Sequence, residues 1–162
     1  MTTAQQPAQQ PAQLEASIEI DAPPAQVWAL ISDPRRMSGF SPQVVKTFVR
    51  GGGPVTAGTK FLNLNHRGPV FWPTQAEVVR CEPHREFGFR VKENYTIWSF
   101  TLEPTSDGGT RLTQRRETPR GISTLSTSLT RVALGGVPKF TGELQQGMHE
   151  TLARIKAAAE NR

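Results

Sequence analysis

The chain has 162 residues, enough for one domain with a full hydrophobic core and too few for two. Hydrophobic residues make up 36% and charged residues 20%, a composition typical of soluble globular proteins and outside the range of disordered ones. No apolar run approaches the ~18 residues of a membrane helix, and the N-terminus lacks a signal-peptide pattern. We therefore expect a cytoplasmic protein with no membrane span.

The net charge of +5 raises the question of a nucleic-acid partner. Most of the excess lies in residues 111–139, where five arginines and Lys139 are opposed only by Glu117. This stretch has no recognised nucleic-acid motif and no stacking aromatic residues between its arginines. We expect no nucleic-acid partner, and a basic partner- or nucleic-acid-binding module remains the third of three functions considered.

In chain order, residues 1–13 are rich in Gln, Ala and Pro and predict a disordered tail before a single domain at 14–162. Alternating apolar residues over 14–21 predict a half-buried strand. Pro23-Pro24 then begins a helix that continues to Ile31, because proline suits the first turn. A second, short helix is predicted over residues 35–39.

Six strand-length runs follow, at residues 43–50, 59–66, 70–82, 86–93, 95–103 and 110–118. Turn residues such as Gly68-Pro69 and Asp107-Gly108 separate them, which predicts an antiparallel meander. From Phe140 to Ala159 apolar residues recur every three or four positions, which predicts a long helix with one apolar stripe. That stripe needs an apolar partner, and one face of the meander is the partner available.

Short segments within this layout carry a family resemblance: Gly58-Thr59-Lys60-Phe61, Asn65-His66-Arg67-Gly68, Phe87-Gly88-Phe89, Trp98-Ser99-Phe100 and Gly147-Met148-His149-Glu150. Over residues 14–160 the chain resembles the polyketide cyclase/dehydrase-like branch of the START and Bet v 1-like (SRPBCC) superfamily. The resemblance implies an α+β helix-grip fold: a curved antiparallel seven-stranded sheet around a long C-terminal helix, with two short helices after the first strand. It also implies a deep apolar cavity, but no catalytic motif that could be transferred.

Metal and cofactor motifs fail on inspection. His149-Glu150 is followed by Ala153 where a zinc protease needs its second histidine. The three histidines have no local ligand spacing, and Cys81 is the single cysteine. We expect no metal and no cofactor, and the sequence identifies no catalytic residue.

The inward face of the sheet holds the candidate ligand-binding residues, because alternate residues of a strand share one face. Those of the three central strands are Trp72, Thr74, Ala76, Phe87, Phe89, Trp98 and Phe100. The helical stripe adds Leu144 and Met148. Alternation does not decide which face of the strand at 59–66 points inward, because Phe61 lies on one face and Leu62 and Leu64 lie on the other.

The last strand breaks the apolar pattern. Leu112 should point inward, which puts Gln114 and Arg116 on the same face. A buried arginine is costly unless an anion pairs with it, so Arg116 predicts either an anionic ligand or a place at the cavity mouth. A bulge near Arg115 that turns Arg116 to solvent is the alternative. The Ser- and Thr-rich residues 123–130 form either a polar helix face or a lid.

The preferred function is a small-molecule binding protein whose cavity holds a lipophilic or aromatic, polyketide- or lipid-like ligand bearing an acidic or hydroxyl group. The alternative is a cofactor-independent polyketide cyclase or dehydratase that uses the same cavity, with Arg116 or His66 polarising a carbonyl or moving a proton. Because the sequence identifies no pair of acid and base residues, the binding function is ranked above the enzyme. The expected partner is a small hydrophobic ligand, and the protein is expected to be a monomer or a homodimer.

Overall fold

A computed structural model describes residues 13–118 and 137–161 of the chain. The elements in order are β1 (Gln13–Ile20), α1 (Pro24–Ile31), the 3-10 helix η1 (Pro34–Gly39), β2 (Val44–Val49), β3 (Lys60–Arg67), β4 (Val70–Glu82), β5 (Glu86–Val91), β6 (Ile97–Pro104), β7 (Thr110–Glu117) and α3 (Val137–Glu160). The predicted tail lies outside the described residues, apart from Gln13 at the start of β1. These elements confirm the predicted order of strands and helices.

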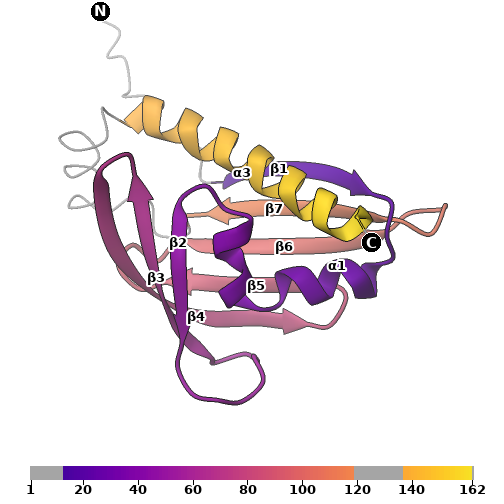
Figure 1. Cartoon of the computed structure of the whole chain (residues 1–162), viewed down its shortest axis with the longest axis horizontal. Coiled ribbons are helices and arrows are strands. Elements are labelled where there is room, and N and C mark those ends of the chain that lie inside the picture. Colours follow the sequence, from indigo (N-terminus) through magenta and orange to yellow (C-terminus); the bar gives the residue numbers. More distant parts are fainter. Residues whose placement is uncertain (1–12, 119–136, 162) are drawn as a thin grey trace, which may run out of the picture.

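All seven strands form one antiparallel sheet in the order β1-β7-β6-β5-β4-β3-β2. The strands from β2 to β7 are a meander, and β1 adds to its far edge. The sheet is strongly twisted, so that β2 and β3 run across the direction of β6 and β7 (Figure 1). A register shift between Val78 and Arg80 interrupts the β4–β5 ladder, and bulges of this kind increase local twist.

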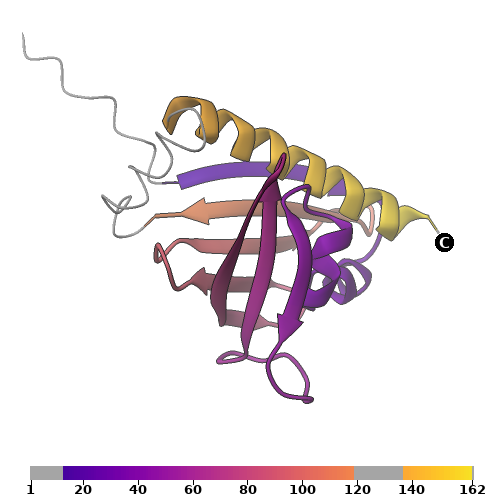
Figure 2. The ribbon, with the colours of Figure 1, turned by 60° about the vertical axis from the view of Figure 1, so that its left-hand side comes forward.

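The long helix α3 packs across one face of this sheet and lies mainly on β1 (Figures 1 and 2). Its stripe of Leu144, Met148, Leu152, Ile155 and Ala159 is buried, as its spacing predicts. Side chains of α3 also satisfy the outer backbone edge of β1. Gln145 Nε2 donates to the carbonyl oxygen of Glu15 at 2.8 Å, and Lys156 Nζ donates to that of Glu19 at 2.7 Å. The sheet curls around the helix in a helix-grip fold.

The helix α1 closes one end of the structure. It begins at Pro24 and buries Val27, Leu30 and Ile31. It ends before Asp33, whose side chain accepts a hydrogen bond from the backbone N–H of Arg35 at 3.0 Å and thereby caps η1. No helix in the two described ranges has both the length and the hydrophobicity to cross a bilayer.

Two glycines show where backbone geometry sets the joints. Gly68 has φ of +55° in the two-residue turn that pairs Arg67 with Val70. A Cβ atom added to Gly109 would lie 2.6 Å from the carbonyl oxygen of Ile20, so only glycine fits where the turn before β7 meets the end of β1. The first of these turns fixes the register that positions the candidate site.

Candidate ligand-binding site

The face of the sheet that α3 covers, here called the concave face, is defined by the strand register. On β6 and β7 the cross-strand partners are Leu102 with Leu112, Phe100 with Gln114, and Trp98 with Arg116. Neither ladder of β7 has a register shift. Arg116 therefore shares a face with Trp98, and the alternative in which a bulge at position 115 turns it to solvent does not hold.

The inward face of β3, which alternation did not decide, follows from the register of the hairpin between β3 and β4. Because Arg67 pairs with Val70, Asn65 lies opposite Trp72 and Asn63 opposite Thr74. The buried residues of β3 are then Phe61, Asn63 and Asn65. Counting residues back from the Gly68-Pro69 turn would have assigned these positions, since the inward residues of β4 were already predicted.

One part of the concave face is fully packed, and we call it the closed end. Its side chains from β5 to β7 are each at most 3% exposed; α1 contacts β6 and α3, and α3 contacts β7. Trp28 of α1 packs edge-on against Phe87, with 6.2 Å between ring centroids. The closed end comprises Phe87, Phe100, Leu102, Leu112, Leu152 and Ile155.

Side chains farther along the same face keep accessible surface, and we call this region the open end. It comprises Trp72, Thr74, Phe89, Trp98 and Arg116, all half-buried although they point toward the side that α3 covers. The N-terminal half of α3 borders it. There Glu143 accepts hydrogen bonds at 2.6 Å from both Nε and Nη2 of Arg67, which ties the β3–β4 hairpin to the helix.

Arg116 is the cation of the open end. Its guanidinium lies over the Trp98 ring, 5.8 Å from the centroid. Among the described residues no carboxylate lies within ion-pair distance of it. Burial without a charged partner lowers the pKa of Arg116 to about 10. An anion placed here would offset part of the cost of burying the charge.

Gln114 lies two residues before Arg116 on the same strand face. Its side-chain Oε1 is buried and accepts no hydrogen bond from any residue that the structure describes. A buried acceptor without a donor costs about 1–3 kcal/mol. The two polar positions of β7 thus supply a cation and an acceptor, and neither has a complementary partner within residues 13–118 and 137–161.

The amides of β3 behave differently because they are satisfied within the protein. Asn63 Oδ1 accepts from Thr47 Oγ1 at 2.6 Å, and Asn65 Nδ2 donates to Thr74 Oγ1 at 3.0 Å and to the Trp72 carbonyl oxygen at 3.2 Å. These bonds stiffen the polar wall opposite β7. They leave Gln114 and Arg116 as the groups that a ligand can complete.

The predicted site residues divide between the two ends. Trp72, Thr74, Phe89, Trp98 and Arg116 gather at the open end. The remaining six are buried and form its floor or belong to the closed end: Ala76, Phe87, Phe100, Gln114, Leu144 and Met148. Sequence analysis missed Phe61, Asn63 and Asn65, all on the strand whose inward face alternation did not decide.

His66, considered for proton transfer, lies on the opposite face of the sheet. It stacks on Phe71, with 5.7 Å between ring centroids, and neighbours the inward-facing Asn65. Because alternate residues of a strand face opposite sides, His66 cannot reach a ligand on the concave face. Within residues 13–118 and 137–161, no three His, Cys, Asp or Glu side chains are grouped to hold a metal ion. The segment considered as a lid, residues 123–130, lies outside the described residues.

Comparison with known proteins agrees with this architecture. The solution structure of a Polyketide_cyc-like protein, Cgl2372 from Corynebacterium glutamicum, is 28% identical, with a TM-score of 0.61, over 92% of this chain and 91% of that one. Two di-domain ARO/CYC proteins share the fold at lower identity: BexL from the BE-7585A pathway (17%, TM-score 0.71) and StfQ from the steffimycin pathway (15%, TM-score 0.74). The matches span 93% of this chain and only 50% and 51% of those chains.

No curated protein matches the chain significantly. The family model described as "Polyketide cyclase / dehydrase and lipid transport" matches residues 11–160, which include every described strand and helix. The chain therefore belongs to the polyketide cyclase/dehydrase and lipid transport family.

Proposed function

We propose that the protein binds a small lipophilic or aromatic ligand that carries an acidic group and a hydroxyl group, and that it does so at the open end of the concave face. The indoles of Trp72 and Trp98 and the ring of Phe89 would contact the apolar body of the ligand. Aromatic side chains offer wide contact with little rotamer entropy to lose. The buried residues Ala76, Gln114, Leu144 and Met148 would form the floor, with Phe87 and Phe100 behind them.

The single observation that carries this proposal is the pair of uncompensated polar groups on β7. Arg116 has no carboxylate partner among the described residues and a pKa lowered to about 10, and Gln114 Oε1 has no donor there. A guanidinium binds a carboxylate through two parallel hydrogen bonds, and an amide oxygen accepts from a hydroxyl. A purely apolar ligand would leave both groups unpaired.

The first experiment asks whether a ligand is present and whether acidity matters. Native mass spectrometry of freshly purified protein should show a bound small molecule, whose mass names its class. Affinities for 2-naphthoic acid and its neutral carboxamide, measured from Trp fluorescence, should favour the acid. Equal affinities would remove Arg116 as the anchor, and the absence of any saturable binding would refute the carrier function.

The alternative function is a cofactor-independent cyclase or dehydratase. The family description and the ARO/CYC proteins that share this fold favour it. On the same geometry, Arg116 would stabilise an enolate that forms only in the transition state. Incubation with poly-β-keto thioester mimics separates the two functions, because a carrier returns the substrate unchanged and an enzyme yields a cyclised or dehydrated product in an Arg116-dependent manner.

A further inference from the structure

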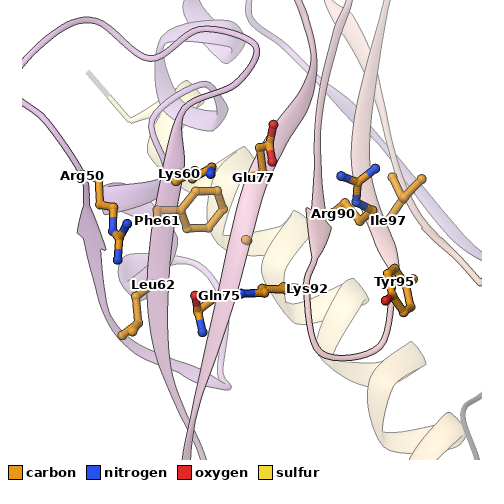
Figure 3. Close-up of a pocket in the computed structure, with 11 residues that line it drawn as sticks. Arg50, Lys60, Phe61, Leu62, Gln75, Glu77, Arg90, Lys92, Tyr95 and Ile97 are labelled. Carbon is orange, nitrogen blue, oxygen red and sulfur yellow. The ribbon is translucent and has the colours of Figure 1, made fainter.

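The convex face of the sheet, opposite α3, carries a groove of about 860 Å³ (Figure 3). One row of its lining consists of successive register partners on β3 to β6: Lys60, Glu77, Arg90 and Ile97. A second row contains Leu62, Gln75, Lys92 and Tyr95, and Arg50 stands at the β2 side. This groove is separated from the open end by the thickness of the sheet.

The groove is basic, because four cationic side chains share its lining with one carboxylate. Arg50, Lys60, Arg90 and Lys92 are exposed, and none forms an ion pair with a residue that the structure describes. Elsewhere on the sheet, Arg80 forms ion pairs with Glu86 and Glu117, and Arg115 forms one with Glu15. The lone carboxylate in the lining is Glu77, and the nearby Glu93 accepts hydrogen bonds from the backbone N–H of Gln75.

Apolar surface continues from the groove along the same face. Leu62 is 36% exposed, and its cross-strand partner Phe48 is 52% exposed. Tyr95 at the other end is 45% exposed. The free face of an antiparallel sheet is normally polar, so exposed aromatic and aliphatic side chains beside unpaired cations indicate a recognition surface.

We propose that this groove docks an acidic amphipathic segment of a partner protein, with its apolar side chains on Leu62 and Phe48 and its carboxylates against the cations. The spacing favours a segment over a single small anion. From Arg50, which follows β2, through Lys60 on β3 to Arg90 on β5, the cations span three inter-strand distances, about 14 Å in all, so several spaced anions match them better than one.

Two other occupants fit less well. A second copy of the chain related by a two-fold axis would bring cations onto cations. A bilayer presents a nearly flat surface, whereas these side chains line a hollow. An extended or helical acidic segment fills a hollow and brings several spaced negative charges, which is the complement that the lining offers.

The test titrates ¹⁵N-labelled protein with a short amphipathic peptide that has leucine on one face and glutamate on the other. A matched peptide with glutamine in place of glutamate is the control. We expect saturable NMR shifts at Lys60, Arg90 and Ile97 with the glutamate peptide, and an affinity that falls about tenfold as salt screens the charges. Equal binding of the glutamine peptide, or no shifts in the groove at ~1 mM peptide, would overturn the proposal.

Charge-reversal variants locate the surface. The double variant Lys60→Glu/Arg90→Glu should weaken peptide binding at least about twentyfold, since attraction becomes repulsion at two positions. The control Arg35→Glu/Arg85→Glu makes the same net charge change outside the groove and should bind within about twofold of the unaltered protein. If phosphatidylglycerol vesicles or single-stranded DNA bind more strongly than the peptide, the partner is a membrane or a nucleic acid and the proposal of a protein segment is wrong.

Binding of 2-naphthoic acid, which reports on the concave face, should not change in either variant.

Discussion

Phe100 and Phe89 lie on neighbouring strands and point to the same face of the sheet, yet Phe100 is 2% exposed and Phe89 is half-buried. The difference comes from what covers them. Phe100 belongs to the closed end, which both α1 and the C-terminal half of α3 overlie, whereas α1 does not extend over the open end (Figure 1). One uninterrupted sheet thus has a packed region and an accessible region.

The polar groups follow this division in part. The closed end consists of apolar side chains and Arg116 lies at the open end, whereas Gln114, the cross-strand partner of Phe100, lies at the boundary between the two. Packing at the closed end supplies the stability that tolerates their cost. We therefore expect the closed end to contribute most to stability, and the proposed function assigns recognition to the open end. The following variants test both.

The largest expected effect is on stability. Replacing Phe100 with Ala removes a fully buried ring and should lower the free energy of unfolding by about 3–5 kcal/mol. Phe89→Ala is the matched variant, and its cost should be clearly smaller because its ring is partly exposed. Urea denaturation measures both. The affinity for 2-naphthoic acid should fall in Phe89→Ala and stay unchanged in Phe100→Ala. Equal stability losses, or weaker binding only in Phe100→Ala, would contradict the division into two ends.

Next in size is the effect of Arg116 on selectivity. Arg116→Met keeps much of the side-chain length and removes the charge. It should reduce the preference for 2-naphthoic acid over its carboxamide by about 10- to 150-fold, which corresponds to the ~1.5–3 kcal/mol of a charged hydrogen bond. Calorimetric titration of both ligands measures the preference. Arg115→Met, on the convex side of the same strand, is the control. An unchanged preference in Arg116→Met would show that the acid is recognised elsewhere.

A smaller effect of unusual sign is expected at Gln114. Gln114→Leu removes a buried oxygen that has no donor in the part of the chain that the structure describes, so the ligand-free protein should become more stable by roughly 1 kcal/mol, at the low end of the cost of such an atom. Affinity for a hydroxylated ligand should fall in the same variant. Thermal denaturation and a titration with 6-hydroxy-2-naphthoic acid measure the two effects. Destabilisation with unchanged affinity would mean that Gln114 acts only in packing.

The smallest effect concerns pH. The pKa of Arg116 is lowered to about 10, so the guanidinium is fully charged at pH 8 and half-charged near pH 10. Affinity for an acidic ligand should therefore fall about twofold between these pH values. Because the folded pKa lies below the unfolded one, the charge destabilises the folded state at neutral pH, and this cost is relieved above pH 10. The pH dependence of affinity in Arg116→Met, measured over the same range, gives the contribution of all other groups, which is subtracted.

Sequence reasoning was sufficient where the deciding pattern was local. The alternation in β6 and β7 predicted Trp98 and Arg116 on one face, with a bulge near Arg115 as the alternative, and the spacing from Leu144 to Ala159 identified the buried stripe of α3. It was insufficient for β3, where apolar residues fall on both faces and only the hairpin register decides. It also considered His66 for proton transfer, and the alternation around Asn65 places His66 on the other face.

The order of charges along the sequence also failed to predict where the protein has a basic surface. The basic stretch at residues 111–139 stood out in the sequence, yet Arg115 within it is neutralised by Glu15 from β1, a hundred positions away. The cations of the convex groove are scattered from Arg50 to Lys92 and gave no local signal. Adjacent strands bring them together at spacings of about 4.8 Å, which no window of sequence contains.

The sequence by itself determined the strands, the helices and the side of the sheet that most residues face, because these depend on the period of two or 3.6 residues within one element. The family followed from the resemblance of short motifs. The tertiary structure alone decided which inward residues are packed and which remain accessible. That depends on where α1 and α3 lie over the sheet, and so on contacts between residues far apart in the chain. The burial of Arg116, which lowers the pKa of its guanidinium, likewise depends on the tertiary structure.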